Sequence, residues 1–185
     1  MQSATEQSVL GDFSERTAEH YGQSARFFKE DGRYWVDVKY QGREHQRYEI
    51  LYTFGVDPLQ QYLVSAEKGR LQVMPFAWDS RSLELGGQRW MHLYPQQEIP
   101  PDDRLHWQQP LQNWNGMCAD CHSTALVRNY RPGQDSFNTQ WQEINVGCRS
   151  CHADMAPEHG LADGGNTSQA EGGLWVRTAQ QHTAG

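Results

Sequence analysis

The sequence predicts an α+β fold with much irregular structure, in which a small antiparallel β-meander precedes a loop-rich segment with short helices. Three observations predict it. Apolar and polar residues alternate between residues 24 and 78, with glycine turns between the alternating runs. Prolines at positions 95, 100, 101 and 110 interrupt the next segment and exclude long helices and central strands there. A short motif of two cysteines and a histidine then occurs twice.

The meander is predicted from the period of the side chains. The run RYWVDVKY (33–40) alternates in the manner of a half-buried strand, and QRYEILYT (46–53) places Tyr48, Ile50 and Tyr52 on one face. Shorter candidates are 61–64 and 71–76. Asp31-Gly32 predicts a tight hairpin before the first run, because glycine tolerates the positive φ that a two-residue turn requires.

Four segments follow from these patterns. They are an N-terminal arm (1–23), an antiparallel β region (24–85), a region that holds both cysteine motifs (86–156), and a tail rich in Gly, Ser, Thr and Gln (157–185). Short helices are expected after each motif histidine and across NTQWQEIN (138–145).

The composition limits the classes of function and partner that the protein can have. Hydrophobic residues make up only 37% of the 185 residues, yet aromatic residues reach 11%, a composition that fits either a well-solvated chain or a core completed around a flat apolar group such as haem. The net charge of -7 makes nucleic acid an unsuitable partner. No apolar run approaches the ~20 residues of a membrane span, so no transmembrane segment is expected. The N-terminus lacks the basic and apolar regions of a signal peptide.

The two motifs carry the chemistry. Cys118-Ala-Asp-Cys121-His122 and Cys148-Arg-Ser-Cys151-His152 both match C-x-x-C-H, the pattern of covalent haem attachment, and together they use every cysteine in the chain. Two thiols at this spacing can each add to a haem vinyl group, and the adjacent imidazole can then bind the iron. The motifs therefore predict two haem c groups.

Other uses of four cysteines stay open at this point. A structural zinc ion also binds two C-x-x-C pairs, but 26 residues separate Cys121 from Cys148, against ~15–20 in zinc ribbons, and both histidines would be coincidental. Redox dithiols favour a βαβ unit that the sequence does not predict. Two tight disulfides would leave both histidines unexplained.

Beyond the motifs, the chain resembles the bacterial multihaem c-type cytochromes, which are often continued by tetratricopeptide repeats. The resemblance spans residues 8–152. Its blocks are AEHYGQSARFF (18–28), YTFGVDPLQQYLV (52–64), AWDSR (77–81), GGQRWMHLYP (86–95), IPPDDRLHW (99–107), QNWNGMCADCHST (112–124) and EINVGCRSCH (143–152). It implies an electron-transfer protein with His122 and His152 as proximal iron ligands. It also implies a periplasmic or extracellular location, with the export signal outside this chain.

The resemblance also implies partners: redox proteins, or further haem domains of the same assembly. Assembly into an oligomer is compatible with the sequence. Four histidines are candidate distal ligands, namely His20, His92, His106 and His159. We expect bis-histidine haems that form part of a multihaem relay. The alternatives are a multihaem oxidoreductase that acts on a small nitrogen or sulfur compound, and a zinc-binding interaction module.

Overall fold

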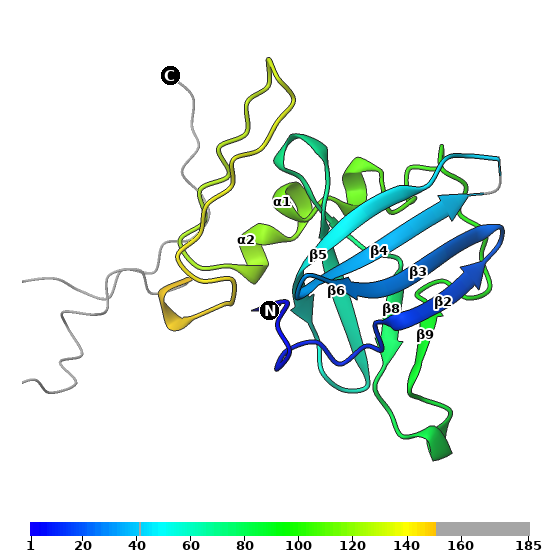
Figure 1. Cartoon of the computed structure of the whole chain (residues 1–185). Coiled ribbons are helices and arrows are strands. Elements are labelled where there is room, and N and C mark those ends of the chain that lie inside the picture. The colour runs from blue at the N-terminus through cyan, green and yellow to red at the C-terminus, as the bar shows by residue number, and fades with distance from the viewer. Residues whose placement is uncertain (41, 151–185) are drawn as a thin grey trace, which may run out of the picture.

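The structure is a computed structural model that describes residues 1–40 and 42–150 (Figure 1). Its main feature is one antiparallel sheet with the strand order β2-β3-β4-β5-β6-β8-β9, to which β1 adds on β5 and β7 adds on β6. The sheet curls until it is nearly closed, and β2 then lies near β9. The strands are β1 (Gln2–Ser3), β2 (Ser14–His20), β3 (Gln23–Glu30), β4 (Arg33–Tyr40), β5 (Gln46–Phe54), β6 (Leu59–Ser65), β7 (Leu71–Val73), β8 (Phe76–Asp79) and β9 (Arg89–His92).

The predicted α+β class with a loop-rich, short-helix second half is wrong, because the described chain is mostly antiparallel β. Its two α-helices have four residues each, α1 (Trp114–Met117) and α2 (Ala119–His122). The other helical turns are 3-10 turns. They are η1 (Glu67–Gly69), η2 (Leu83–Leu85), η3 (Pro110–Gln112) and η4 (Cys148–Ser150).

Tertiary pairing explains the additional β structure. Residues 14–20, within the expected arm, form β2 because they pair along β3, and β9 continues the sheet beyond residue 85 by pairing with β8. Residues 138–145 were expected to be helical. They are extended instead, and Gln140 and Glu143 form bridges to Val127 and Thr124. The side chain of Trp141 packs edge-on against Trp114, and this contact favours the extended form over a free helix.

The predicted hairpin is confirmed. β3 and β4 pair from Gln23–Tyr40 to Glu30–Arg33, and the two turn residues, Asp31 and Gly32, have φ values of 49° and 75°. Both values lie in the left-handed region, which matches the right-handed twist of a two-residue hairpin. The alternation in 33–40 is also confirmed, since Tyr34, Val36 and Val38 are buried.

The prediction for β5 is only partly right. Tyr48 and Ile50 face the large cluster described below, but Tyr52 packs in a second cluster with its neighbour Leu51. The register of β5 against β6 shifts between Ile50 and Tyr52. An extra residue in one strand reverses the faces of the side chains that follow, and alternation alone cannot reveal it.

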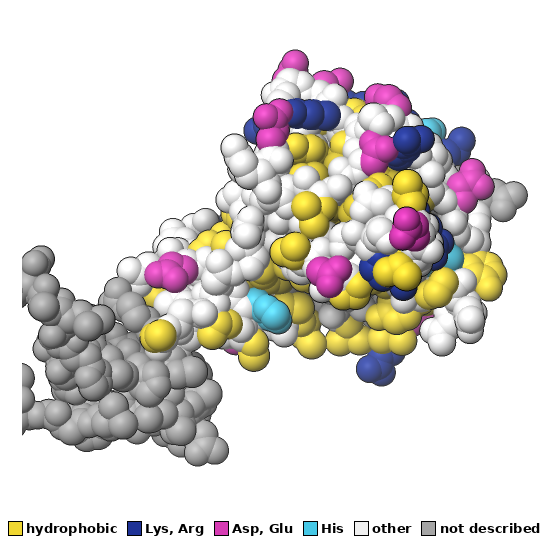
Figure 2. Space-filling model, turned by 90° about the horizontal axis from the view of Figure 1, so that it is seen from below, with side chains coloured by type: hydrophobic (Ala, Val, Ile, Leu, Met, Phe, Trp, Pro, Cys, Tyr) yellow, Lys and Arg dark blue, Asp and Glu magenta, His cyan; other side chains and the backbone are white. Residues whose placement is uncertain are grey.

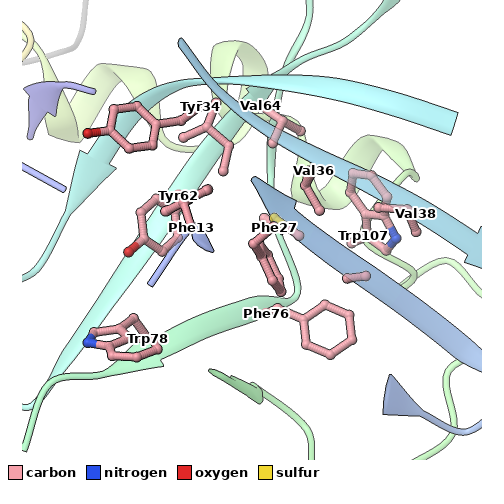
Figure 3. Packing of buried hydrophobic residues seen from close by; sticks show 13 residues of the cluster. Phe13, Phe27, Tyr34, Val36, Val38, Tyr62, Val64, Phe76, Trp78 and Trp107 are labelled. Atoms are coloured by element: carbon pink, nitrogen blue, oxygen red, sulfur yellow. The ribbon is translucent and has the colours of Figure 1, made fainter. Parts of the chain in front are cut away.

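The large core cluster lies on the concave side of the sheet and is mainly aromatic (Figure 3). The rings of Phe27 and Trp90 stack with centroids 3.6 Å apart and an interplanar angle of 3°. Phe13 meets both Tyr34 and Tyr62 edge-on. The aromatic side chains thus fill this core by packing on one another, so the aromatic-rich composition is explained here without a flat cofactor.

A smaller cluster lies on the other face of β6. Leu63, between the inward-facing Tyr62 and Val64, packs there with Leu71, Trp114 and Ala119. These contacts hold α1 and α2 against the sheet. Within the described residues no helix is long and apolar enough to span a membrane.

Candidate functional site

The first motif forms one helical turn at the C-terminal end of α1. Cys118 joins α1 to α2, and its carbonyl oxygen accepts hydrogen bonds from the backbone N–H groups of Cys121 and His122, both at 3.1 Å. Residues three and four apart on a helical turn share a face, so the turn brings both thiols and the imidazole to one side. Cys118 is half-buried against the smaller cluster, whereas Cys121 and His122 are exposed. Burial raises the pKa of the Cys118 thiol, and the nearby Cys121 raises it further.

A buried amide network fixes the direction of this turn. The side chain of Asn113 caps α1 by accepting a hydrogen bond from Gly116 N at 2.9 Å, and it donates to Gln72 Oε1 at 3.0 Å. Asn115 Oδ1 accepts from Leu71 N at 2.7 Å. Neither asparagine was singled out from the sequence, although an Asn directly before a helix is a capping signal. Together they tie the first motif to β7.

The second motif is held close to the first by one side chain, that of Thr124. Thr124 follows His122 by two residues and is 1% exposed. Its Oγ1 donates to Asn145 O at 2.7 Å, accepts from Gly147 N at 3.0 Å and lies 2.7 Å from Ser150 Oγ. These three partners flank Cys148, so the structure brings the end of the first motif close to the start of the second. Sequence reasoning missed this role of Thr124.

Three of the predicted site residues, Cys151, His152 and His159, lie outside the described residues. Cys148 is exposed at the start of η4, and the three described cysteines form no disulfide with one another. Within residues 1–40 and 42–150 no three His, Cys, Asp or Glu side chains are grouped to hold a metal ion. A zinc site built on both motifs would need Cys151 as well.

The first motif fits a covalently attached haem. Two thiols and an imidazole lie on one turn, in which Cys118 is half-buried and Cys121 and His122 are exposed, and exposed apolar side chains lie near the motifs in the sequence. These side chains are Met117, Val127, Tyr130 and Val146. In Figure 2, hydrophobic side chains reach the surface at many points, with charged side chains spaced among them. Covering such surface with a flat apolar group is favourable.

Three candidate distal ligands lie together elsewhere. His20 ends β2, His92 ends β9 and His106 lies in the loop between β9 and α1, and all three line one pocket of about 180 Å³. The rings of His20 and His92 stack with centroids 3.5 Å apart and an interplanar angle of 7°. No residue of the described range 114–150 lines this pocket. In Figure 1 the arrowhead of β2 points away from α2. The structure therefore groups these histidines with one another and not with His122.

Two of the three histidines in this pocket, His92 and His106, are buried, and both are neutral near pH 7. Burial lowers the pKa of His92 to about 4, and repulsion from His20 adds to the effect. Burial, followed by the charge of Arg43, lowers the pKa of His106 to about 4. Each Nδ1 accepts a backbone hydrogen bond, His92 from Tyr94 N at 3.1 Å and His106 from Gln108 N at 3.3 Å.

With this geometry established, the chain was compared with known proteins. No protein family, no curated protein and no solved structure matches it.

Proposed function

We propose that this chain carries two covalently bound c-type haems and transfers electrons as one segment of a multihaem relay. The observation that carries the proposal is that two C-x-x-C-H motifs use all four cysteines of the chain, and that Thr124, just after the first motif, is bonded to the segment around Cys148, where the second begins. A zinc ribbon or a pair of disulfides gives no reason for a histidine directly after each motif. The likeness to multihaem c-type cytochromes, set out above, adds to this reasoning.

The role of each motif residue follows from its chemistry. Cys118, Cys121, Cys148 and Cys151 would form thioether bonds, and His122 and His152 would bind iron on the proximal side. A haem bound there supplies a one-electron iron couple. The protein would determine the positions of the two haems. The Asn113 and Asn115 network orients the first turn, and Thr124 keeps the second motif beside it, so the two groups would lie close enough to exchange electrons.

The distal side would be completed by a residue from outside the histidine pocket. His20, His92 and His106 share a pocket that no residue of 114–150 lines, so they do not face His122. His159, or a histidine from a further haem domain of the assembly, is the candidate that stays consistent with bis-histidine ligation. Six-coordinate iron carries electrons without binding a substrate, which favours a carrier over an enzyme.

The expected location and partners follow from the same chemistry. Haem is attached to such motifs outside the cytoplasm, so we propose a periplasmic or extracellular protein. The net charge of -7 suits a basic redox partner, whose encounter with this chain would weaken as salt rises.

The experiment is expression with an export signal and the cytochrome maturation machinery, followed by intact mass and a reduced-minus-oxidised spectrum. We expect the mass of two haems. Replacing Cys148 and Cys151 with alanine should leave one haem, and His122→Gln should keep both additions but change the spectrum of one. His45→Gln, a change at an exposed histidine outside both motifs, is the matched control and should change neither.

Three results would contradict the proposed function. A folded, colourless protein with bound zinc would establish the interaction module instead. A high-spin signal, or binding of CO without loss of a histidine ligand, would favour the oxidoreductase. A single haem in the unaltered chain would exclude a relay within it.

A further inference from the structure

Residues 124–143 form a long hairpin between the two cysteine motifs. Antiparallel bridges pair its two sides, from Thr124–Glu143 at the base to Arg131–Ser136 near the tip. In Figure 1 this hairpin runs beside the turn that joins β6 to β7. Its base and its tip are attached to the rest of the protein by different kinds of contact.

The base of the hairpin is held by apolar packing. Trp141 lies edge-on to both Trp114 and Tyr52 in the smaller cluster, with ring centroids 5.4 Å and 5.8 Å away. The tip differs, because Tyr130 and Phe137 pack on each other and lie outside both clusters of the described residues. A cleft of about 260 Å³ remains where this side of the hairpin meets the sheet. Apolar burial therefore contributes little to holding the tip.

Charged and polar side chains hold the tip instead. Arg70 Nη2 lies 2.6 Å from Asp135 Oδ1, and the Tyr130 hydroxyl donates to the same oxygen at 3.0 Å. Lys68 Nζ lies 3.8 Å from Asp135 Oδ2. The side chains of Lys68 and Asp135 are 52% and 54% exposed, so dissolved ions can reach and screen these pairs. We call this group of four side chains, Lys68, Arg70, Tyr130 and Asp135, the latch.

The turn on which the tip docks allows a close approach of the two backbones. Phe137 N–H donates to Lys68 O at 2.9 Å, and within the described chain the hairpin makes no other backbone hydrogen bond to that turn. Gly69 leaves room for this contact, because a Cβ at Gly69 would lie 2.1 Å from Phe137 O. Release of the tip therefore breaks one identifiable backbone bond, and Phe137 N–H can report it.

The docked hairpin also supports α1, through Thr139. Thr139 Oγ1 accepts a hydrogen bond from Asn115 Nδ2 at 2.9 Å and donates to Arg128 O at 3.0 Å. Asn115 is buried in α1, and its Oδ1 accepts from Leu71 N at 2.7 Å. If Thr139 moves away with the tip, Asn115 Nδ2 keeps only the longer bond to Gly69 O, at 3.3 Å. Release of the tip is thus transmitted to the helix that leads into the first motif.

We propose that the latch makes this hairpin a salt-sensitive device, in which release of the tip from the turn between β6 and β7 loosens Asn115 and hence α1. Exposed ion pairs contribute little to stability, so the docked tip is only slightly favoured over the released one. Rising salt then shifts the balance toward release. The firmness with which the first cysteine motif is held would therefore depend on ionic strength. This inference concerns the polypeptide itself and does not rest on the proposed function.

The test is amide hydrogen exchange of the full chain, read residue by residue at about 20 mM and about 0.5 M sodium chloride. Phe137 N–H should exchange about twofold to fivefold faster at the higher salt, the effect of weakening exposed ion pairs. Leu71 N–H should change in the same direction, because its acceptor is Asn115. Gln140 N–H is the internal control and should not change, since it bonds to Val127 O within the hairpin.

Asp135→Asn removes the negative charge of the latch. The backbone should not be strained, because Asp135 has a φ of 48°, a left-handed value that Asn adopts readily. In this variant Phe137 should exchange at low salt as fast as it does in the parent at high salt, and added salt should have little further effect. Glu15→Gln is the matched control, because Glu15 pairs with Arg26 at 2.8 Å on β2 and β3. This control should leave Phe137 exchange unchanged.

Four results would overturn the proposal. If exchange at Phe137 does not depend on salt, or is the same in Asp135→Asn and the parent at low salt, the latch does not hold the tip. If Leu71 exchange stays constant while Phe137 exchange rises, release of the tip does not reach α1. If Gln140 exchange rises together with Phe137 exchange, the whole hairpin unfolds and the tip is not released by itself.

Discussion

Replacing Thr124 with valine should loosen the second motif. Valine keeps the shape of threonine but removes Oγ1, which contacts Asn145 O, Gly147 N and Ser150 Oγ. The backbone bonds that remain, such as Gln142 N to Thr124 O at 2.9 Å, hold the hairpin but not residues 145–150. The change therefore acts on the segment that leads into Cys148.

The expected size follows from these three contacts. Each hydrogen bond contributes roughly 0.5–1.5 kcal/mol, and the partners are partly reached by water, so we expect a local loss of about 1–3 kcal/mol. Local opening should then become about 5- to 150-fold more frequent. Gly147 is the reporter, because its N–H loses its only acceptor in the described chain.

The assay is amide hydrogen exchange at Gly147, with Thr124→Ser as the control that keeps the hydroxyl. Exchange should accelerate in the valine variant and stay near the original rate in the serine variant. In protein matured with haem, the valine variant should also contain more molecules with a single haem. Equal exchange rates in both variants and the parent would refute the role given to this hydroxyl.

Three further predictions concern the sheet. Gln23→Leu should raise the free energy of unfolding by about 1–2 kcal/mol in a denaturant titration, because it removes a buried donor that has no partner among the described residues; a loss of stability would contradict this. Gly69→Ala should destabilise far more than Gly86→Ala in thermal melts. Both glycines have positive φ, but only at Gly69 would a Cβ meet Phe137 O, at 2.1 Å, and equal losses would exclude that clash. The pKa of His106, about 4 in the fold and 6.5 when unfolded, means that the unfolded chain binds more protons between these values. Stability should therefore fall as pH drops from 6.5 to 4, and His106→Gln should flatten that slope by up to ~1.4 kcal/mol per pH unit; an unchanged slope would contradict the assignment.

Local signals predicted the parts of the fold that local chemistry decides. Asp31-Gly32 identified a hairpin because only the turn geometry matters there, and residues 33–40 alternate because one face is buried. Residues 14–20 carry no such signal, since β2 is largely exposed and owes its conformation to pairing with β3. Residues 138–145 read as helical, but packing of Trp141 on Trp114 prevails.

The candidate site could likewise be predicted only where local sequence determines it. The spacing of the cysteines predicts which residues would attach haem, because covalent attachment requires that spacing along the chain, and this stays a prediction. The grouping of His20, His92 and His106 depends on the curl of the sheet, which brings β2 beside β9, and no pattern within either strand reports it. The role of Thr124 could not be predicted from the sequence, because its hydrogen-bond partners lie some twenty residues away along the chain. A single threonine after a histidine belongs to no known motif.

The two hydrophobic clusters of the protein also separate the sheet from the candidate haem site. The aromatic core includes Phe27, Tyr62 and Phe76 and closes on itself, and it shares no residue with the cluster that supports Cys118. The core of the sheet is therefore complete without any residue of the two cysteine motifs. Under the proposed function, haem would stabilise α1, α2 and the hairpin that follows them. Substitutions in the aromatic core should therefore act on the sheet, whereas substitutions at Cys118 and Cys121 should act on the proposed haem attachment, and the two effects should be separable.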